Sequence, residues 1–249
     1  ALLRGEDYSF NQIYLPASIH TSTLSNDPPV EEQIIKLAGN TVDAGETKIV
    51  EMEVESGAQS LAVSAFVNSE MLEASLMSPD GTTYPGELGP PTGEGFFGDA
   101  WTLSMEVADP PAGQWELHLS AQEDSAFLLL ASVETTLGVQ LAGWEDTPLH
   151  AGEPWRLQAG LTSPVAGAAI EQVEIQLSRA ERRPSRPGAS QEVARGTARG
   201  RSLEIRALPE PGIYSVVVTV TGRQGDRPFE RVFFRSIRVV DGPGSSSSS

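Results

Sequence analysis

The chain has 249 residues, no cysteine, 24 glycines, 18 prolines and a formal net charge of −17. This length suits two domains of about 100–150 residues each, and the lack of cysteine excludes disulfides, thiolate catalysis and Cys-ligated zinc. The negative charge argues against a nucleic-acid partner, because binding phosphates needs a positive surface. No apolar run approaches the roughly 18–20 residues needed to span a bilayer, so no transmembrane segment is predicted.

Residues 1–40 are predicted to form a short strand, a loop and a helix. Residues 12–15 form the strand, and Asp27-Pro28 suits the N-cap and first position of the helix. An apolar stripe at i, i+4 and i+7 supports the helix, and it consists of Val30, Ile34 and Leu37. The loop between strand and helix carries His20.

Residues 41–135 are predicted to form an acidic β-sandwich. Apolar and polar residues alternate in several short segments separated by turns, as in Val50-Glu51-Met52-Glu53-Val54. Glycine and proline are frequent in residues 85–99, which are predicted to form a long loop. Residues 1–135 hold 22 acidic and three basic side chains, a net charge of −19, whereas residues 136–249 have a net charge of +2. This charge break supports a domain boundary near residue 135.

Residues 136–241 are predicted to form a second antiparallel β-sandwich. Strands are expected in six segments: 138–144, 154–162, 170–179, 202–207, 212–221 and 229–240. Tyr214, at the start of the fifth segment, resembles the tyrosine corner of immunoglobulin-like domains. Residues 181–200 are predicted to form a mobile basic loop, and residues 242–249 a Gly/Ser tail. The predicted fold class is therefore all-β, with two tandem antiparallel β-sandwiches, jelly-roll-like and then immunoglobulin-like.

The stretch around His20 resembles the end of an α/β-hydrolase domain. Ile13-Tyr14-Leu15-Pro16-Ala17-Ser18-Ile19-His20-Thr21-Ser22-Thr23-Leu24-Ser25-Asn26-Asp27 is similar to the last strand, the histidine loop and the approach to the final helix in lecithin:cholesterol acyltransferase-like lipases. The resemblance covers about 30 residues and implies that His20 is the catalytic general base. A serine nucleophile and an acid would then lie upstream of Ala1, because the chain has no G-x-S-x-G motif. The alternative is a polar histidine in an unrelated linker.

The acidic region resembles bacterial pre-peptidase C-terminal and proprotein-convertase P-type jelly rolls. Three segments carry this resemblance: Leu76-Met77-Ser78-Pro79-Asp80-Gly81, Trp101-Thr102-Leu103-Ser104 and Asp109-Pro110-Pro111-Ala112-Gly113-Gln114-Trp115-Glu116-Leu117. Several such folds bind calcium through loop carboxylates, and Asp80, Asp99, Glu123 and Asp124 could act as oxygen ligands. The chain lacks the D-x-D-x-D-G spacing, so no metal site and no cofactor are predicted.

These observations together predict non-catalytic C-terminal modules of a secreted bacterial lipase or esterase. The expected partners are an upstream hydrolase domain and a cell-surface or lipid substrate, and the expected location is extracellular or on the cell surface. The alternative is an adhesion protein in which the same sandwiches follow a von Willebrand A-type domain. The chain alone is expected not to be an enzyme. It begins with Ala1 rather than Met, and we expect it to be part of a longer protein.

Overall fold

The structure is a computed structural model that describes residues 30–91, 99–144, 149–162, 165–180, 190–206 and 210–241. Within these ranges the chain is all-β, and no helix is present. The described residues accordingly contain no helix long and apolar enough to cross a membrane.

The first unit contains two sheets that face each other across one hydrophobic core. Sheet A has the strand order β1-β9-β3-β7-β6 and sheet B the order β2-β8-β4-β5. The strands are β1 (Glu31–Val42), β2 (Thr47–Val54), β3 (Ser60–Val67), β4 (Leu72–Met77), β5 (Thr83–Pro85), β6 (Glu87–Gly89), β7 (Trp101–Ala108), β8 (Gly113–Ala121) and β9 (Ser125–Thr135). All neighbouring strands in the two sheets run antiparallel.

Alternating residues of both sheets supply the core of the first unit. Val50, Met52 and Val54 of β2 are buried, as their alternation with glutamates predicts. Trp115 of β8 is fully buried, and its indole N–H donates a 2.9 Å hydrogen bond to the carbonyl of Pro111. The large apolar residues named here therefore pack the interior of the first unit.

The helix predicted from Val30, Ile34 and Leu37 is wrong. Residues 31–42 form β1, which pairs antiparallel with β9 along its whole length. A β-bulge between Ile34 and Lys36 turns Ile35 toward the core and leaves Ile34 on the opposite face with Leu37. Apolar residues on both faces of a bulged strand produced the spacing that resembles a helical stripe.

The second unit also has two sheets around its own core. Sheet C has the order β10-β12-β15 and sheet D the order β11-β17-β16-β13-β14. The strands are β10 (Val139–Ala142), β11 (Leu149–His150), β12 (Trp155–Leu161), β13 (Ala168–Ala180), β14 (Ser190–Arg199), β15 (Ser202–Ile205), β16 (Gly212–Gln224) and β17 (Arg227–Val240). Only the short β11–β17 contact is parallel among the pairs described in these sheets.

Two predicted loops contain strands. β14 lies within residues 181–200 and pairs with β13 at the edge of sheet D, with Arg195 and Arg199 along it. β6 lies within residues 85–99 and pairs with β7. These polar segments are ordered by backbone pairing to a neighbouring strand, and such pairing cannot be predicted from amino-acid composition alone.

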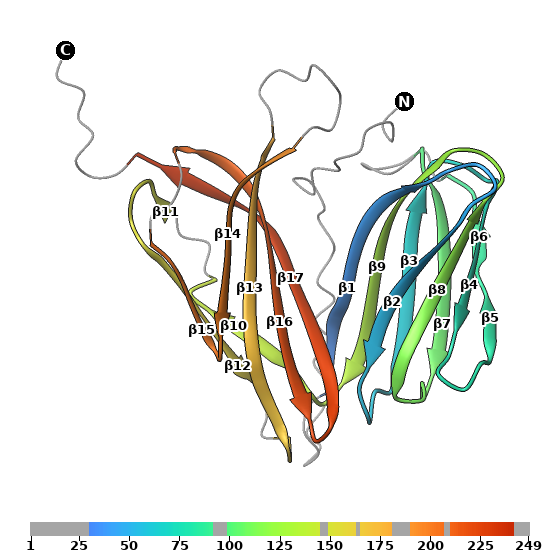
Figure 1. The fold of residues 1–249 in the computed structure, drawn as a ribbon, viewed down its shortest axis with the longest axis horizontal. Helices are drawn as coiled ribbons and strands as arrows, with labels where there is room; N and C mark the ends of the chain where they lie inside the picture. The colour runs from blue at the N-terminus through green and yellow to red at the C-terminus, as the bar shows by residue number, and fades with distance from the viewer. Residues whose placement is uncertain are drawn as a thin grey trace.

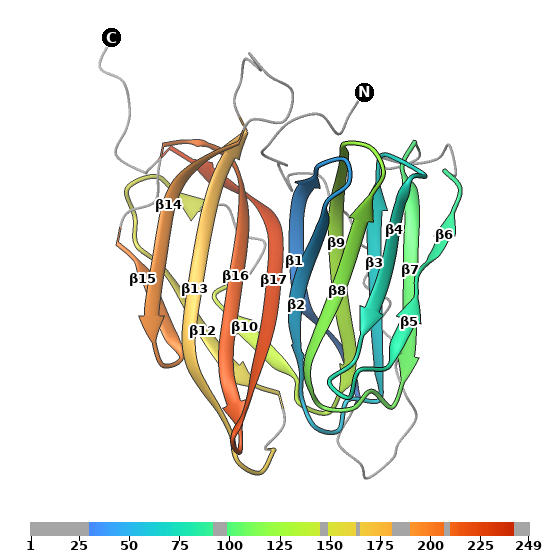
Figure 2. The ribbon, with the colours of Figure 1, turned by 45° about the vertical axis from the view of Figure 1, so that its right-hand side comes forward.

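The two units stand side by side and approach each other at the end where β1 and β17 begin (Figure 1). Toward the opposite end the two strands diverge. The view turned by 45° shows the same arrangement, with β1 and β2 nearest to β17 (Figure 2). The contact between the units is thus built from β1, β2, the start of β17 and the link between β9 and β10.

Candidate functional site at the junction of the two units

The catalytic role predicted for His20 falls on a residue outside the described parts of the chain. The same holds for the strand predicted at residues 12–15. His20 as a general base therefore stays a prediction.

The four carboxylates considered as calcium ligands lie in turns at two ends of the first unit. Asp80 follows β4, whereas Glu123 and Asp124 join β8 to β9, and Asp99 precedes β7 at that same end. These positions separate Asp80 from the other three by the length of the sheet. A single ion could not be bound by all four.

Each of three carboxylates accepts a hydrogen bond, Asp80 within its own turn and the other two from neighbouring connections of the first unit. Asp80 accepts hydrogen bonds from the Ser78 hydroxyl and from the backbone N–H of Thr82, and these bonds lower its pKa. Asp124 accepts a 3.0 Å hydrogen bond from the backbone N–H of Ala44. Glu123 accepts a closer hydrogen bond from the hydroxyl of Ser69. The described residues contain no group of three or more His, Asp or Glu placed to hold a metal ion.

His118 lies on the outward face of sheet B. Its Nε2 lies 2.9 Å from Oε2 of Glu116, two residues earlier on β8, and Ser75 of β4 is its cross-strand neighbour. β8 lies between β2 and β4, so its backbone amides are committed to the ladders on both sides. The backbone donors of β8 beside His118 and Ser75 are therefore engaged in strand pairing rather than free to bind an oxyanion.

The most unusual group of charged residues lies between the units. Arg231 of β17 and Glu55, which follows β2, form an ion pair in which the arginine side chain is 1% exposed and the glutamate 0%. Nη1 of Arg231 donates to Oε2 of Glu55 at 3.3 Å, and Nη2 donates to Oε1 in a closer contact. The pair is bidentate and joins residues 176 positions apart in the sequence.

Arg231 also binds the backbone where the chain passes from one unit to the other. Nη2 donates a 2.9 Å bond to the carbonyl of Leu137, and Nη1 donates a 2.8 Å bond to that of Glu230. Leu137 itself is buried and belongs to the second core. One guanidinium therefore holds β17, the connecting segment and the end of β2 together. We call Glu55, Leu137 and Arg231 the junction.

Further contacts across the interface surround the junction. The N–H of Val139 donates a 3.1 Å bond to the side-chain oxygen of Gln33, and Nη1 of Arg227 donates a 2.7 Å bond to the carbonyl of Ala112. Lys36 and Glu230 approach each other at 3.8 Å. The first unit thus contacts the second through β1, through the end of β2 and through the turn before β8.

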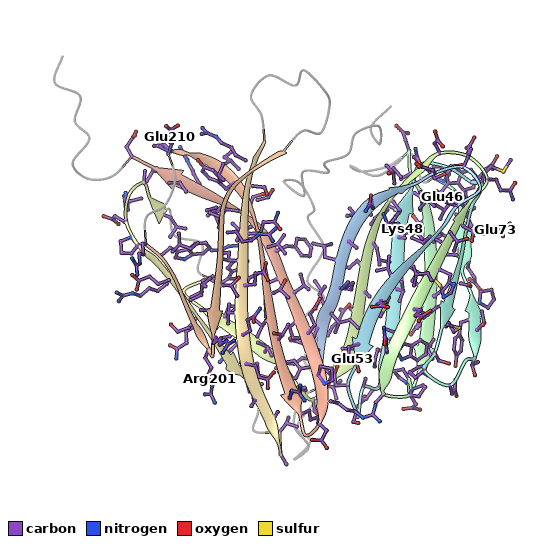
Figure 3. The ribbon with its side chains drawn as sticks, in the orientation of Figure 1. Glu46, Lys48, Glu53, Glu73, Arg201 and Glu210 are labelled. Carbon is purple, nitrogen blue, oxygen red and sulfur yellow. The ribbon has the colours of Figure 1, made fainter. Side chains whose placement is uncertain are left out.

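A shallow groove of about 210 Å³ opens beside the junction. Its lining residues come from both units, and they are Ile35, Lys36, Glu51, Met52, Glu53, Gln114 and Glu230. Partial burial raises the pKa of Glu53, and the nearby positive charge of Arg227 opposes that rise. Glu53 lies low on the first unit, on the side facing the second unit (Figure 3). The groove contains no nucleophile placed against a base, so it does not resemble a catalytic site.

Sequence reasoning missed the junction, although one signal was present. Phe229, Phe233 and Ile237 lie on one face of β17 and contribute to the second core, and alternation puts Arg231 on that same face. A charged residue at an inward position of a strand almost always has a charged partner. The partner, Glu55, could not be named without the structure.

Comparisons with known proteins give a likeness of fold. No family model matches the chain, and no curated protein matches it. Among solved structures, the Bacillus licheniformis lipase BlEst2 in its propeptide form is similar to 87% of this chain, with a TM-score of 0.57 and 18% identity. A DUF4785 family protein from Legionella pneumophila matches 87% of the chain with a TM-score of 0.46 and 12% identity. The chain spans 43% of the length of the Bacillus chain and 65% of that of the Legionella chain. The all-β chain is therefore structurally similar to part of a bacterial lipase.

Proposed function

We propose that this chain supplies two rigidly joined, non-catalytic β modules to a secreted bacterial lipase or esterase. The observation that carries the proposal is the likeness to the Bacillus lipase, which extends over 87% of this chain and so includes both units. The junction supports the same view, because a buried ion pair joins the second module directly to the first. A pair of modules with fixed geometry suits a role in positioning a substrate or a cell surface relative to a catalytic domain.

The strand orders support a jelly-roll-like first module and an immunoglobulin-like second one. A jelly roll folds two Greek keys into two packed antiparallel sheets, and the first unit interleaves early and late strands in this manner, as β1-β9-β3-β7 and β2-β8-β4-β5. In the second unit the Tyr214 hydroxyl donates a 2.6 Å bond to the carbonyl of Glu210, four residues upstream. This is the contact by which a tyrosine corner is recognised in immunoglobulin-like sandwiches.

The partner in this proposal is an α/β-hydrolase domain upstream, to which His20 would contribute the general base. Its imidazole would take the proton of a serine hydroxyl and return it to the leaving alcohol. The described residues hold two other histidines, and both have local roles. His118 pairs with Glu116, and Nδ1 of His150 lies 3.0 Å from the carbonyl of Asp241. They serve as matched controls for His20.

The test is to express the chain with the reading frame that precedes it. Hydrolysis of p-nitrophenyl esters should appear in the longer protein and be absent from the 249-residue chain. His20→Ala should then reduce kcat/KM by about 10³-fold or more, whereas His118→Ala should leave it within about two-fold, as expected for a surface residue outside the site. An upstream G-x-S-x-G sequence would agree with this result.

Two outcomes contradict the proposal. A longer protein whose esterase activity survives His20→Ala would remove the role of this histidine. An upstream D-x-S-x-S sequence without esterase activity would instead favour adhesion modules that follow a von Willebrand A-type domain.

A further inference from the structure

The outward face of sheet A differs from that of an ordinary solvated sheet. In β9, Leu129 and Ala131 point into the core, so alternation puts Leu128, Leu130 and Ser132 on the outward face. The register brings apolar residues of β1 and β3 beside them. We call this surface the outer face of sheet A, and its apolar members are Ile34, Leu37, Ala62, Phe66, Leu128 and Leu130.

The corresponding face of sheet B is strongly charged. Four glutamates and one histidine are among its outward residues on three neighbouring strands, and they are Glu51, Glu53, Glu73, Glu116 and His118. By contrast, β3 has no charged residue and β9 has one, Glu134, near its end. In a unit with so many acidic side chains, the single charge on β3 and β9 together indicates a surface that is covered.

The exposures agree with a covered surface. Leu128 is 6% exposed and Ser132 is 5% exposed, although both point away from the core. The hydroxyl of Ser132 donates a 3.0 Å bond to the carboxylate of Glu32 on β1. A leucine on the open face of a solvated sheet would remain substantially accessible to water. His118 and Glu116, outward on the interior strand β8 of sheet B, have side chains that are 30% exposed and provide that comparison within this unit.

We propose that residues 1–29 of this chain pack on the outer face of sheet A. Val30 leads directly into β1, the edge strand of sheet A, which pairs with β9. Three strand spacings of about 4.8 Å separate β1 from β7, about 14 Å in all, whereas 29 extended residues reach about 95 Å. The segment is long enough to cross the face and is tethered at its edge.

The composition of residues 1–29 fits an apolar surface. Four of their side chains are formally charged, namely Arg4, Glu6, Asp7 and Asp27, whereas residues 30–135 are strongly acidic. Large apolar and aromatic residues are frequent in the segment, and they are Leu2, Leu3, Tyr8, Phe10, Ile13, Tyr14, Leu15, Ile19 and Leu24. Burying such residues against the outer face would remove apolar area from water on both sides. This inference does not depend on the hydrolase proposal, but if both hold, the contact fixes a hydrolase domain against the first module.

Photocrosslinking in the full 249-residue chain identifies the occupant directly. Leu130 is replaced by the photoreactive residue p-benzoylphenylalanine, and Ile49 is replaced in the same way as the control on sheet B. After irradiation of the monomer, mass spectrometry of a digest should find position 130 bonded to a peptide within residues 1–29. Position 49 should give no such product. If the Leu130 variant does not fold by circular dichroism, Ser64, its half-buried neighbour on β3, takes its place.

Proteolysis provides a second readout. Leu130→Lys should place a charge under the segment and speed chymotrypsin cleavage after Tyr8, Phe10 and Tyr14 by about ten-fold or more, whereas Ile49→Lys should not. The proposal is overturned if position 130 bonds only to a second copy of the chain, or to nothing, in a folded protein. It is equally overturned if the unsubstituted chain is cut in residues 1–29 as fast as the free peptide of that sequence.

Discussion

Two ion pairs in this molecule have similar chemistry and opposite surroundings. Arg231 and Glu55 meet at the junction with side chains that are 1% and 0% exposed. Arg156 and Glu204 meet across β12 and β15 at 2.7 Å, with side chains that are 74% and 43% exposed. Both pairs have good contact geometry, so distance alone does not separate them. Burial does, because water stabilises each member of the exposed pair when its partner is lost.

The buried pair matters because neither member can be removed alone. Taking two charges out of water costs several kcal/mol per ion, and only the complete set of contacts offsets this cost. The pair therefore specifies one relative position of the two units, in which Arg231 reaches both Glu55 and the carbonyl of Leu137. The exposed pair specifies nothing of this kind.

The largest effect is expected when one partner of the junction is removed. Arg231→Met leaves the carboxylate of Glu55 buried without its cation, and this should lower the free energy of unfolding by about 3–5 kcal/mol. Urea unfolding followed by tryptophan fluorescence measures it. Arg238→Met, at an exposed position on the same strand, is the control and should change stability by about 0.5 kcal/mol or less. A loss below about 1 kcal/mol for Arg231→Met would mean that water reaches Glu55.

Removing both charges should restore most of what the single variant loses. Arg231→Met combined with Glu55→Leu replaces the pair by apolar groups, and such replacements are often neutral or stabilising. Nε of Arg231 is buried without a hydrogen-bond acceptor in the described residues. The native pair therefore includes a donor whose desolvation lowers the stability of the folded state. The free energy of unfolding of the double variant should lie within about 2 kcal/mol of that of the native protein. Additive losses would show that the two residues act separately.

The exposed pair should contribute little. Arg156→Ala is expected to lower the free energy of unfolding by about 0–1 kcal/mol, and 1 M NaCl should reduce that difference further. The same salt should leave the effect of Arg231→Met nearly unchanged, because the buried pair is screened much less. A salt dependence of equal size for both variants would remove the distinction on which this comparison rests.

Smaller effects should appear in the pH dependence of the free energy of unfolding, to which two carboxyl groups contribute. Burial raises the pKa of Glu53 in the folded state, so the folded protein binds the extra proton and stability falls as pH rises above about 4. Hydrogen bonds lower the pKa of Asp80, so its contribution is present at neutral pH and is lost as pH falls below about 4.

The measurement compares Glu53→Gln with Asp80→Asn in urea unfolding at several pH values. As pH rises from acid to neutral, the free energy of unfolding of Glu53→Gln should increase relative to that of the native protein. That of Asp80→Asn should decrease relative to the native protein over the same range. Shifts of the same sign for both variants would contradict the assignment of burial as the cause at Glu53.

The sequence predicts the strands that alternate cleanly and fails where a strand departs from alternation. Val50, Met52 and Val54 are each buried, as expected for one face of β2. In β1 the bulge between Ile34 and Lys36 breaks the period of two, and the same residues mimic a helix. Local pattern cannot resolve this case, because pairing with β9, about 100 residues later, decides it.

The junction was beyond sequence reasoning for a related physical reason. The inward position of Arg231 on β17 is visible in the alternation, but Glu55 lies after β2 in the other unit. Many glutamates precede residue 135, and nothing in the sequence distinguishes Glu55 from Glu53 or Glu51. The partner is selected by how the two units meet, which depends on the fold of both.

The fixed position of the two units is the central claim, and one distance measurement tests it. The chain has no cysteine, so Glu73→Cys and Arg201→Cys accept spin labels selectively. Both residues are exposed, and they lie on opposite units, Glu73 at the upper right of the first and Arg201 at the lower left of the second (Figure 3). Double electron–electron resonance should give a single narrow distance distribution with the native junction, and a broad one when Arg231→Met is added. A broad distribution with the native junction would show that the units move freely, and would contradict the account.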